Sequence, residues 1–125
     1  EHAEGFFNAD LEGGRRPYKL RITYPFAVAH EVEDPYRFPP LLTDFEIYLH
    51  GEGTHFESWR TMGAHFVRCE GVEGVRFTVW APTAQMVSVA GEFNGWDARM
   101  HPMRLRNGGI WEIFLPEVKR GAVYK

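Results

Sequence analysis

The fold is decided by a run from Val75 to Pro82, which reads VRFTVWAP. Apolar and polar side chains alternate along it, as in a strand with one buried face, and the proline ends the run. A second run, Ile110–Leu115 (IWEIFL), alternates less strictly and follows Asn107-Gly108-Gly109. An Asn-Gly pair before a strand is a strong hairpin signal. The two runs therefore predict an antiparallel β-sheet.

Further short β-segments are expected around these two runs. Residues 86–90 predict a strand, residues 91–97 a turn-rich aromatic loop, residues 103–106 the first arm of the hairpin, and residues 122–125 the start of one more strand. Strands repeating about every 8–12 residues are typical of β-sandwiches. The expected fold class is all-β: an immunoglobulin-like β-sandwich, incomplete at its C-terminal end.

Upstream, the sequence predicts a separate hairpin. Tyr18–Tyr24 alternates with period two, and Ala27–Val32 is β-like after Pro25. Two strands alone are marginal in water. We therefore expect residues 1–33 to be the last strands of an upstream β-module whose earlier strands are absent.

The segment between the two β-regions is expected to be a connector with one short helix. Prolines disfavour helix over residues 34–40. Thr43 to Glu46 is a capping-box pattern, and Gly51 is a stop signal. The i, i+3, i+4 spacing of Phe45, Tyr48 and Leu49 predicts the packed face of this helix; Phe56, Trp59 and Met62 suggest a second helical turn. The expected domains are residues 1–33, 34–65 and 66–125.

Length and charge exclude several classes of function. The chain has 125 residues, with 14 Lys+Arg against 17 Asp+Glu, so it is too short for a (β/α)₈ barrel of about 250 residues and lacks the basic balance of a nucleic-acid partner. No apolar run approaches the roughly 20 residues of a membrane span. One half-buried cysteine, Cys69, allows no internal disulfide and favours a reducing, cytoplasmic location. Because it opens on Glu1, the chain is expected to be cut from a longer protein.

No catalytic, metal or cofactor site is predicted. Glu92 and Asp97 lie in the aromatic loop without a third group or an enclosing pocket, so they are interpreted as solvated charges. The aromatic content of 15% fits an aromatic core. It equally fits a surface on which the apolar faces of sugar rings stack.

Several separated motifs point to one family. The segments 74–82, 87–97, 101–106, 109–112 and 121–125 resemble, in order and spacing, carbohydrate-binding module family 48. Residues 33–40 and 44–55 are similar to the connector of bacterial 1,4-α-glucan (glycogen) branching enzymes. The resemblance implies a β-sandwich that precedes a catalytic barrel in glycogen biosynthesis. It also implies that this chain alone is not catalytic, and that its partners are α-glucan and its own C-terminal barrel.

The resemblance also implies the site residues. Trp96 would stack on a glucose ring, and Lys125 would bond to a glucan hydroxyl; alternatively, Trp96 caps the edge of the sandwich or packs on the barrel. Asn94 would donate to a hydroxyl, although an Asn before Gly is more often turn chemistry. Of the other tryptophans, Trp111 is expected in the core, Trp80 in the core or between modules, and Trp59 as an anchor of the connector.

Three functions remain open on this sequence. The first is a weak α-glucan-binding region of a branching enzyme. The second is a structural module that packs on the barrel and influences the length of the transferred chain without binding sugar. The third is the corresponding region of a debranching or trehalose-forming enzyme. An exposed Trp96 ring favours the first, whereas an apolar patch around it favours the second.

Overall fold

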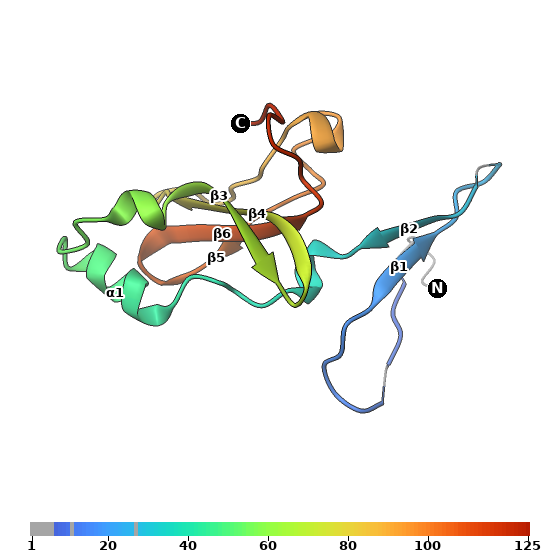
Figure 1. Cartoon of the computed structure of the whole chain (residues 1–125), viewed down its shortest axis with the longest axis horizontal. Coiled ribbons are helices and arrows are strands. Elements are labelled where there is room, and N and C mark those ends of the chain that lie inside the picture. Colours follow the sequence, from blue (N-terminus) through green and yellow to red (C-terminus); the bar gives the residue numbers. More distant parts are fainter. Residues whose placement is uncertain (1–6, 11, 27) are drawn as a thin grey trace.

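The computed structural model describes residues 7–10, 12–26 and 28–125. In this part of the chain the strands form two antiparallel sheets, β1-β2 and β3-β4-β6-β5 (Figure 1). The elements are β1 Lys19–Ile22, β2 His30–Glu33, α1 Asp44–Gly51, β3 Gly63–Cys69, β4 Val72–Trp80, β5 Arg104–Leu105 and β6 Ile110–Pro116, with short 3₁₀ turns η1 Pro35–Arg37, η2 Ser58–Arg60, η3 Glu92–Asn94 and η4 Asn107–Gly109. No helix among the described residues is long and apolar enough to cross a membrane. The all-β prediction is confirmed.

The larger sheet is the one predicted from the two decisive runs. β4 and β6 pair antiparallel, with Phe77 opposite Ile113. η4 joins β5 to β6 as the predicted hairpin turn, in which Gly108 and Gly109 have φ angles of 70° and 75°. A Cβ atom on Gly109 would lie 2.4 Å from the Cα of Pro82, so this turn requires glycine for both its conformation and its packing.

The second layer of the sandwich is less regular than predicted. Residues 86–90 do not form a regular strand, and the pairing in this layer is reduced to single bridges, Ser88 with Pro102 and Gly91 with Tyr124. The expected strand at 86–90 is therefore wrong as a regular element. The backbone hydrogen bonds that flank the Ser88–Pro102 bridge run from the Val89 N–H to the His101 carbonyl and from the Met103 N–H to the Val87 carbonyl. Lys125 exchanges both backbone hydrogen bonds with Ala90, at 2.9 and 2.8 Å. The expected strand start at residues 122–125 is therefore present only as this local pairing and not as a regular strand.

Both faces of the larger sheet are covered. On one face, side chains of β4 and β6 pack against Val89 and Met103 of the second layer. Trp111 lies in this core as predicted, and its indole N–H donates to the carbonyl of Ala81 at 3.0 Å. The other face is covered by the connector, whose Phe38 packs on Phe114. β6 is therefore buried on both sides, and Cys69 is fully rather than half buried.

The capping box that begins α1 is confirmed. Thr43 Oγ1 accepts from the Glu46 N–H, and the Glu46 carboxylate accepts from the Thr43 N–H. The predicted packed face is wrong, because Phe45 and Tyr48 are exposed and Ile47 is the buried residue. α1 crosses only one end of the sheet, where Ile47 joins a small cluster with Leu42 and Ile110.

Two of the other tryptophans lie on the surface. Trp59, in η2, is 64% exposed, and Phe56 is exposed as well. The prediction that Trp59 anchors the connector is therefore wrong. Trp80 ends β4 beyond the second layer and is 56% exposed, so it does not enter the core. Its indole N–H donates to the Gly108 carbonyl at 3.1 Å, and the His50 ring meets it edge-on.

The upstream hairpin is confirmed as an antiparallel pair with Leu20 opposite Val32. Its second strand begins at His30; Ala27, in the predicted strand, lies outside the described residues. The hairpin projects from the end of the sheet opposite α1 (Figure 1). Leu20 is exposed on it. The division into domains at residues 33 and 65 stays a prediction.

Candidate functional site

The aromatic loop after the second layer is held by one buried side chain. Asn94 is 7% exposed, and its Oδ1 accepts from the Gly91 N–H at 2.9 Å. Its Nδ2 donates to the Val89 carbonyl and to His101 Nδ1, both at 2.9 Å. Both amide hydrogens are therefore engaged inside the protein. Asn94 organises the turn, and in this arrangement it has no free N–H for a sugar hydroxyl.

Trp96 leaves this loop in an unusual backbone conformation. Gly95 and Trp96 have φ angles of 60° and 64°, and the Trp96 N–H donates to the Gly91 carbonyl at 2.9 Å. A bulky residue in the left-handed region costs on the order of 1–2 kcal/mol and is uncommon. The indole ring is 45% exposed, as predicted for a ring that follows a tight turn.

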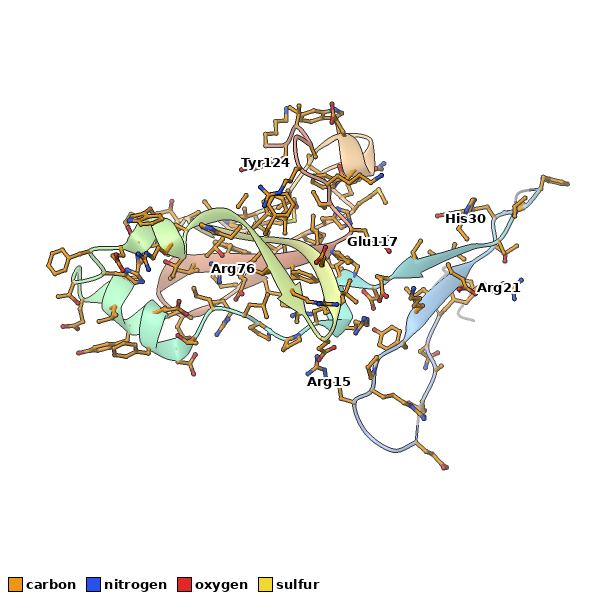
Figure 2. The ribbon with its side chains drawn as sticks, in the orientation of Figure 1. Arg15, Arg21, His30, Arg76, Glu117 and Tyr124 are labelled. Atoms are coloured by element: carbon orange, nitrogen blue, oxygen red, sulfur yellow. The ribbon has the colours of Figure 1, made fainter. Side chains whose placement is uncertain are left out.

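Lys125 reaches the same surface from the end of the chain. Its Nζ lies 5.8 Å from the centroid of the Trp96 ring. The preceding residue points the opposite way: Tyr124 packs edge-on against Phe77 of β4, with ring centroids 4.9 Å apart, between the sheet and the aromatic loop (Figure 2). Because successive side chains of an extended segment point to opposite sides, Lys125 faces away from Phe77 and toward the Trp96 ring. A cation and a flat apolar ring thus stand together at one exposed place.

The two carboxylates of the loop have structural partners. Asp97 accepts from the backbone and the guanidinium of Arg99, and these hydrogen bonds lower the pKa of Asp97 to about 2. The Glu92 carboxylate accepts from the Val123 N–H at 3.3 Å. A general acid needs a raised pKa, whereas the pKa of Asp97 is lowered. Glu92 is exposed on the same loop, so neither carboxylate lies in an enclosed position. Among the described residues no three metal-ligating side chains gather.

Trp96 and Lys125 together form an exposed platform, and an apolar cavity of about 250 Å³ opens beside Lys125. It runs between the two layers along Phe77 and Val79 of β4, Val87 and Val89 of the second layer, and Tyr124–Lys125. Its walls carry few polar atoms, so it suits an apolar side chain better than a hydrated sugar. Lys125 therefore lines the apolar cavity and also lies beside the exposed Trp96 ring.

The comparisons with known proteins agree with this architecture. The sequence profile of carbohydrate-binding module 48 (isoamylase N-terminal domain) matches residues 61–125, which are more than half of the chain. The chain belongs to this family. The module therefore has the fold that its sequence motifs implied, and Trp96 and Lys125 both lie inside the matched region.

Curated relatives of the module cover the upstream residues as well. The chain is 54% identical to a 1,4-alpha-glucan branching enzyme of Rubrobacter xylanophilus, 50% to one of Bradyrhizobium diazoefficiens and 49% to one of Rhodopseudomonas palustris. Each match covers 99% of this chain and 17% of the relative. The predicted resemblance to branching enzymes is confirmed, over less than a fifth of their length.

The module also contains residues that sequence reasoning did not single out for the site. Gly91 must be glycine, since a Cβ there would lie 2.6 Å from the Val123 carbonyl. His101 accepts from Asn94 although seven residues separate them. Both residues fall inside motifs that carried the family resemblance, but only the folded chain shows that they meet.

Proposed function

We propose that this chain is the non-catalytic N-terminal region of a 1,4-alpha-glucan branching enzyme, and that it binds α-glucan weakly through Trp96 and Lys125. The enzyme of which it would be part transfers α-1,4 chains to form α-1,6 branches in glycogen. Retaining transfer of this kind requires two carboxyl groups about 5–5.5 Å apart. Those groups would lie in the catalytic barrel, because the two loop carboxylates described above are engaged elsewhere.

The observation that carries the proposal is the Trp96 ring. It is 45% exposed beside the Lys125 ammonium, on a backbone held in the left-handed region. An apolar ring that faces water gains by stacking on the apolar face of a glucose unit. An ammonium at its rim donates to the hydroxyl groups that surround that face.

Affinity at such a platform is expected to be weak. One aromatic ring and one or two polar contacts suggest a binding free energy on the order of -4 to -6 kcal/mol, which corresponds to millimolar to high-micromolar Kd. Glycogen offers many chain ends, and this raises the effective concentration of sites. The module would thereby hold a glucan near the barrel through repeated transfers.

A structural role is the second candidate, and specific observations favour it. The apolar cavity beside Lys125 suits a protein side chain, and a group of exposed aromatic residues lies at the α1 end of the sheet: Phe45, Tyr48, Phe56, Trp59 and Trp80. Monomeric proteins rarely leave large apolar surfaces uncovered. In this alternative the module packs on the barrel and influences transferred chain length without binding sugar.

The test is a titration of the chain with maltoheptaose. We expect a saturable change in tryptophan fluorescence, with Kd in the range above confirmed by calorimetry. Trp96→Ala is expected to weaken binding at least tenfold, because the stacking surface is removed. Trp59→Ala is the matched control: it deletes a tryptophan of η2 that is 64% exposed and is not paired with Lys125, and it is expected to bind like the wild type.

Two results would contradict the proposal. Equal loss of binding in both variants would place the sugar elsewhere or indicate non-specific adsorption. No binding up to tens of millimolar maltoheptaose, in a chain shown by circular dichroism to be folded, would favour the structural role.

A further inference from the structure

We propose that His101 is a positioning residue for Trp96. In this proposal the neutral ring, with its proton on Nε2, accepts the hydrogen bond from Asn94 that holds residues 91–96 in place. Protonation of His101 then releases the loop, so that glucan binding weakens as the pH falls. The sugar-binding part rests on the proposed function above; the coupling between His101 and Trp96 does not.

The hydrogen bonds around Asn94 determine the tautomer of His101. The Gly91 N–H is a donor, so the atom of Asn94 that faces it, at 2.9 Å, must be the acceptor Oδ1. The remaining atom is Nδ2, whose two hydrogens point to the Val89 carbonyl and to His101 Nδ1. Nδ1 therefore accepts, and the ring is neutral with its proton on Nε2.

Protonation would place two donors against each other. An N–H on His101 Nδ1 would meet the Asn94 N–H across 2.9 Å. Rotating the Asn94 amide by 180° cannot relieve this, because Nδ2 would then face the Gly91 N–H and Oδ1 would face the Val89 carbonyl. Asn94 is buried, so water cannot replace the lost partners without opening the loop.

The same hydrogen bonds connect His101 to the sugar platform. Gly91, which donates to Asn94, also accepts from the Trp96 N–H at 2.9 Å and pairs with Tyr124 in the bridge that precedes Lys125. When Asn94 moves, Gly91 loses its side-chain partner and the left-handed conformation of Trp96 loses its support. The aromatic ring and the ammonium would then no longer stand together.

The surroundings of His101 favour the neutral ring. Burial lowers the pKa of His101 below its ordinary value of about 6.5. The Phe93 ring lies beside it, with centroids 6.0 Å apart. His101 lines a second cavity, between the upstream hairpin and the end of β6. The titratable groups that line it with His101 are Tyr24, His30, Glu33 and Asp34 in and after the hairpin and Glu117 after β6. Those on its own loop are Glu92 and the Asp97–Arg99 pair.

The sign of the pH dependence follows from the lowered pKa. Because the folded loop prefers neutral His101, its stability is full above the ordinary histidine pKa and is lost as the pH falls through the lowered one. If only the neutral form presents the platform, Kd rises about tenfold for each pH unit below the pKa of His101.

The test follows the 125-residue chain by NMR between pH 8 and pH 4.5, with and without maltoheptaose. At pH 7.5 the ring nitrogen shifts of His101 are expected to report the Nε2–H tautomer. In the free chain the Gly91 amide and the Trp96 indole signals are expected to move with the midpoint of His101. Kd for maltoheptaose is expected to rise with that same midpoint.

Two variants separate this coupling from general acid destabilisation. His101→Asn keeps an acceptor near the Nδ1 position without a titratable group, so the Trp96 signal and Kd are expected to become independent of pH in this range. His30→Asn removes a histidine from the same cavity but leaves the hydrogen bonds of Asn94 intact, and it is expected to behave like the wild type.

The other possible results separate the coupling between His101 and Trp96 from the proposed binding of sugar. An Nδ1–H tautomer, or a Trp96 signal that stays still while His101 titrates, overturns the inference even if sugar binds. No sugar binding at any pH overturns the proposed function, while the signals of the free chain still decide the coupling. If His101→Asn does not fold, the titration midpoints of the wild type and of His30→Asn decide in its place.

Discussion

Trp96 combines an exposed side chain with a backbone that is costly to form. Its φ of 64° follows a glycine at 60°, and a glycine at position 96 would adopt this conformation without strain. Packing alone does not explain a tryptophan here, because nearly half of its surface faces water. The proposed stacking function of the ring would account for this residue, and the proposal therefore depends on it more than on any other side chain.

Lys125 allows the charge at this platform to be tested separately from the ring. Lys125→Met keeps most of the apolar stem and removes the ammonium that lies 5.8 Å from the Trp96 centroid. Loss of one hydrogen bond to a sugar hydroxyl is expected to cost about 1 kcal/mol, or about a fivefold rise in Kd for maltoheptaose. Calorimetry at constant pH measures it.

Lys119→Met is the control for that variant, since it removes a lysine outside the platform. Unchanged binding by Lys125→Met would leave Trp96 as the proposed contact and would remove Lys125 from the site.

At the scale of elements, the connector and the sheet are joined by one buried carboxylate. Glu112, on β6, is 3% exposed; its Oε1 accepts from the N–H groups of Leu41 and Leu42 at 2.7 and 2.8 Å. Its Oε2 accepts from Arg106 at 2.6 Å. These bonds satisfy backbone donors just before α1, where the chain crosses the outer face of the sheet. The connector is thereby held in register with β6.

Removing this carboxylate is expected to destabilise the whole sheet. Glu112→Ala leaves two backbone N–H groups and a half-buried guanidinium without their acceptor, at an expected cost of about 3 kcal/mol in the free energy of unfolding. Urea denaturation followed by tryptophan fluorescence measures this. Glu73→Ala, an exposed glutamate on the neighbouring β4, is expected to change stability by less than about 0.5 kcal/mol. Equal effects of the two variants would contradict this role for Glu112.

Across the whole molecule, the upstream hairpin is attached through a second buried charge. Arg37, in η1, is 8% exposed, and its guanidinium pairs with Glu33 of β2 at 2.8 Å and with Glu70, after β3, at 2.9 Å. Arg15 also pairs with Glu70 near the turn between β3 and β4 (Figure 2). A few ion pairs thus link a hairpin with exposed apolar residues to a sheet that has its own core.

The hairpin is therefore expected to separate from the sheet when Arg37 is removed. Arg37→Ala leaves the Glu33 carboxylate, 6% exposed, with a weaker partner, and breaking one side of a buried pair is strongly unfavourable. Amide exchange in β1 and β2 is expected to accelerate at least tenfold, while β4 and β6 keep their protection. Mass spectrometry of peptic fragments measures both regions.

Arg68→Ala is the matched control, because Arg68 is exposed on β3 near the same turn. Uniform acceleration across the sheet in Arg37→Ala would mean that the hairpin and the sheet unfold as one unit.

The sequence by itself determined those elements whose formation depends only on residues that are close together in the chain. The strand at residues 75–80, the glycine turn at 107–109 and the capping box at Thr43 follow from local patterns, and each forms as predicted. The expectation of one buried face on that strand is wrong, because Arg76 and Thr78 are buried and Val79 is exposed. Local patterns failed where the buried side of an element depends on how it packs against the sheet. The spacing of Phe45 and Tyr48 is helical, but which face of α1 is buried depends on where the helix meets the sheet, and there Ile47 is the contact.

The candidate site could be described only by combining the sequence with the tertiary structure. Local turn chemistry indicated that Trp96 is exposed, and the family resemblance named Lys125, but neither showed that the two side chains meet at 5.8 Å. Only the tertiary structure brought Asn94 to His101 and Glu112 to the connector, because such contacts depend on how the layers stack. Sequence periodicity records which side of an element is apolar; which polar groups meet across buried layers is decided when those layers pack.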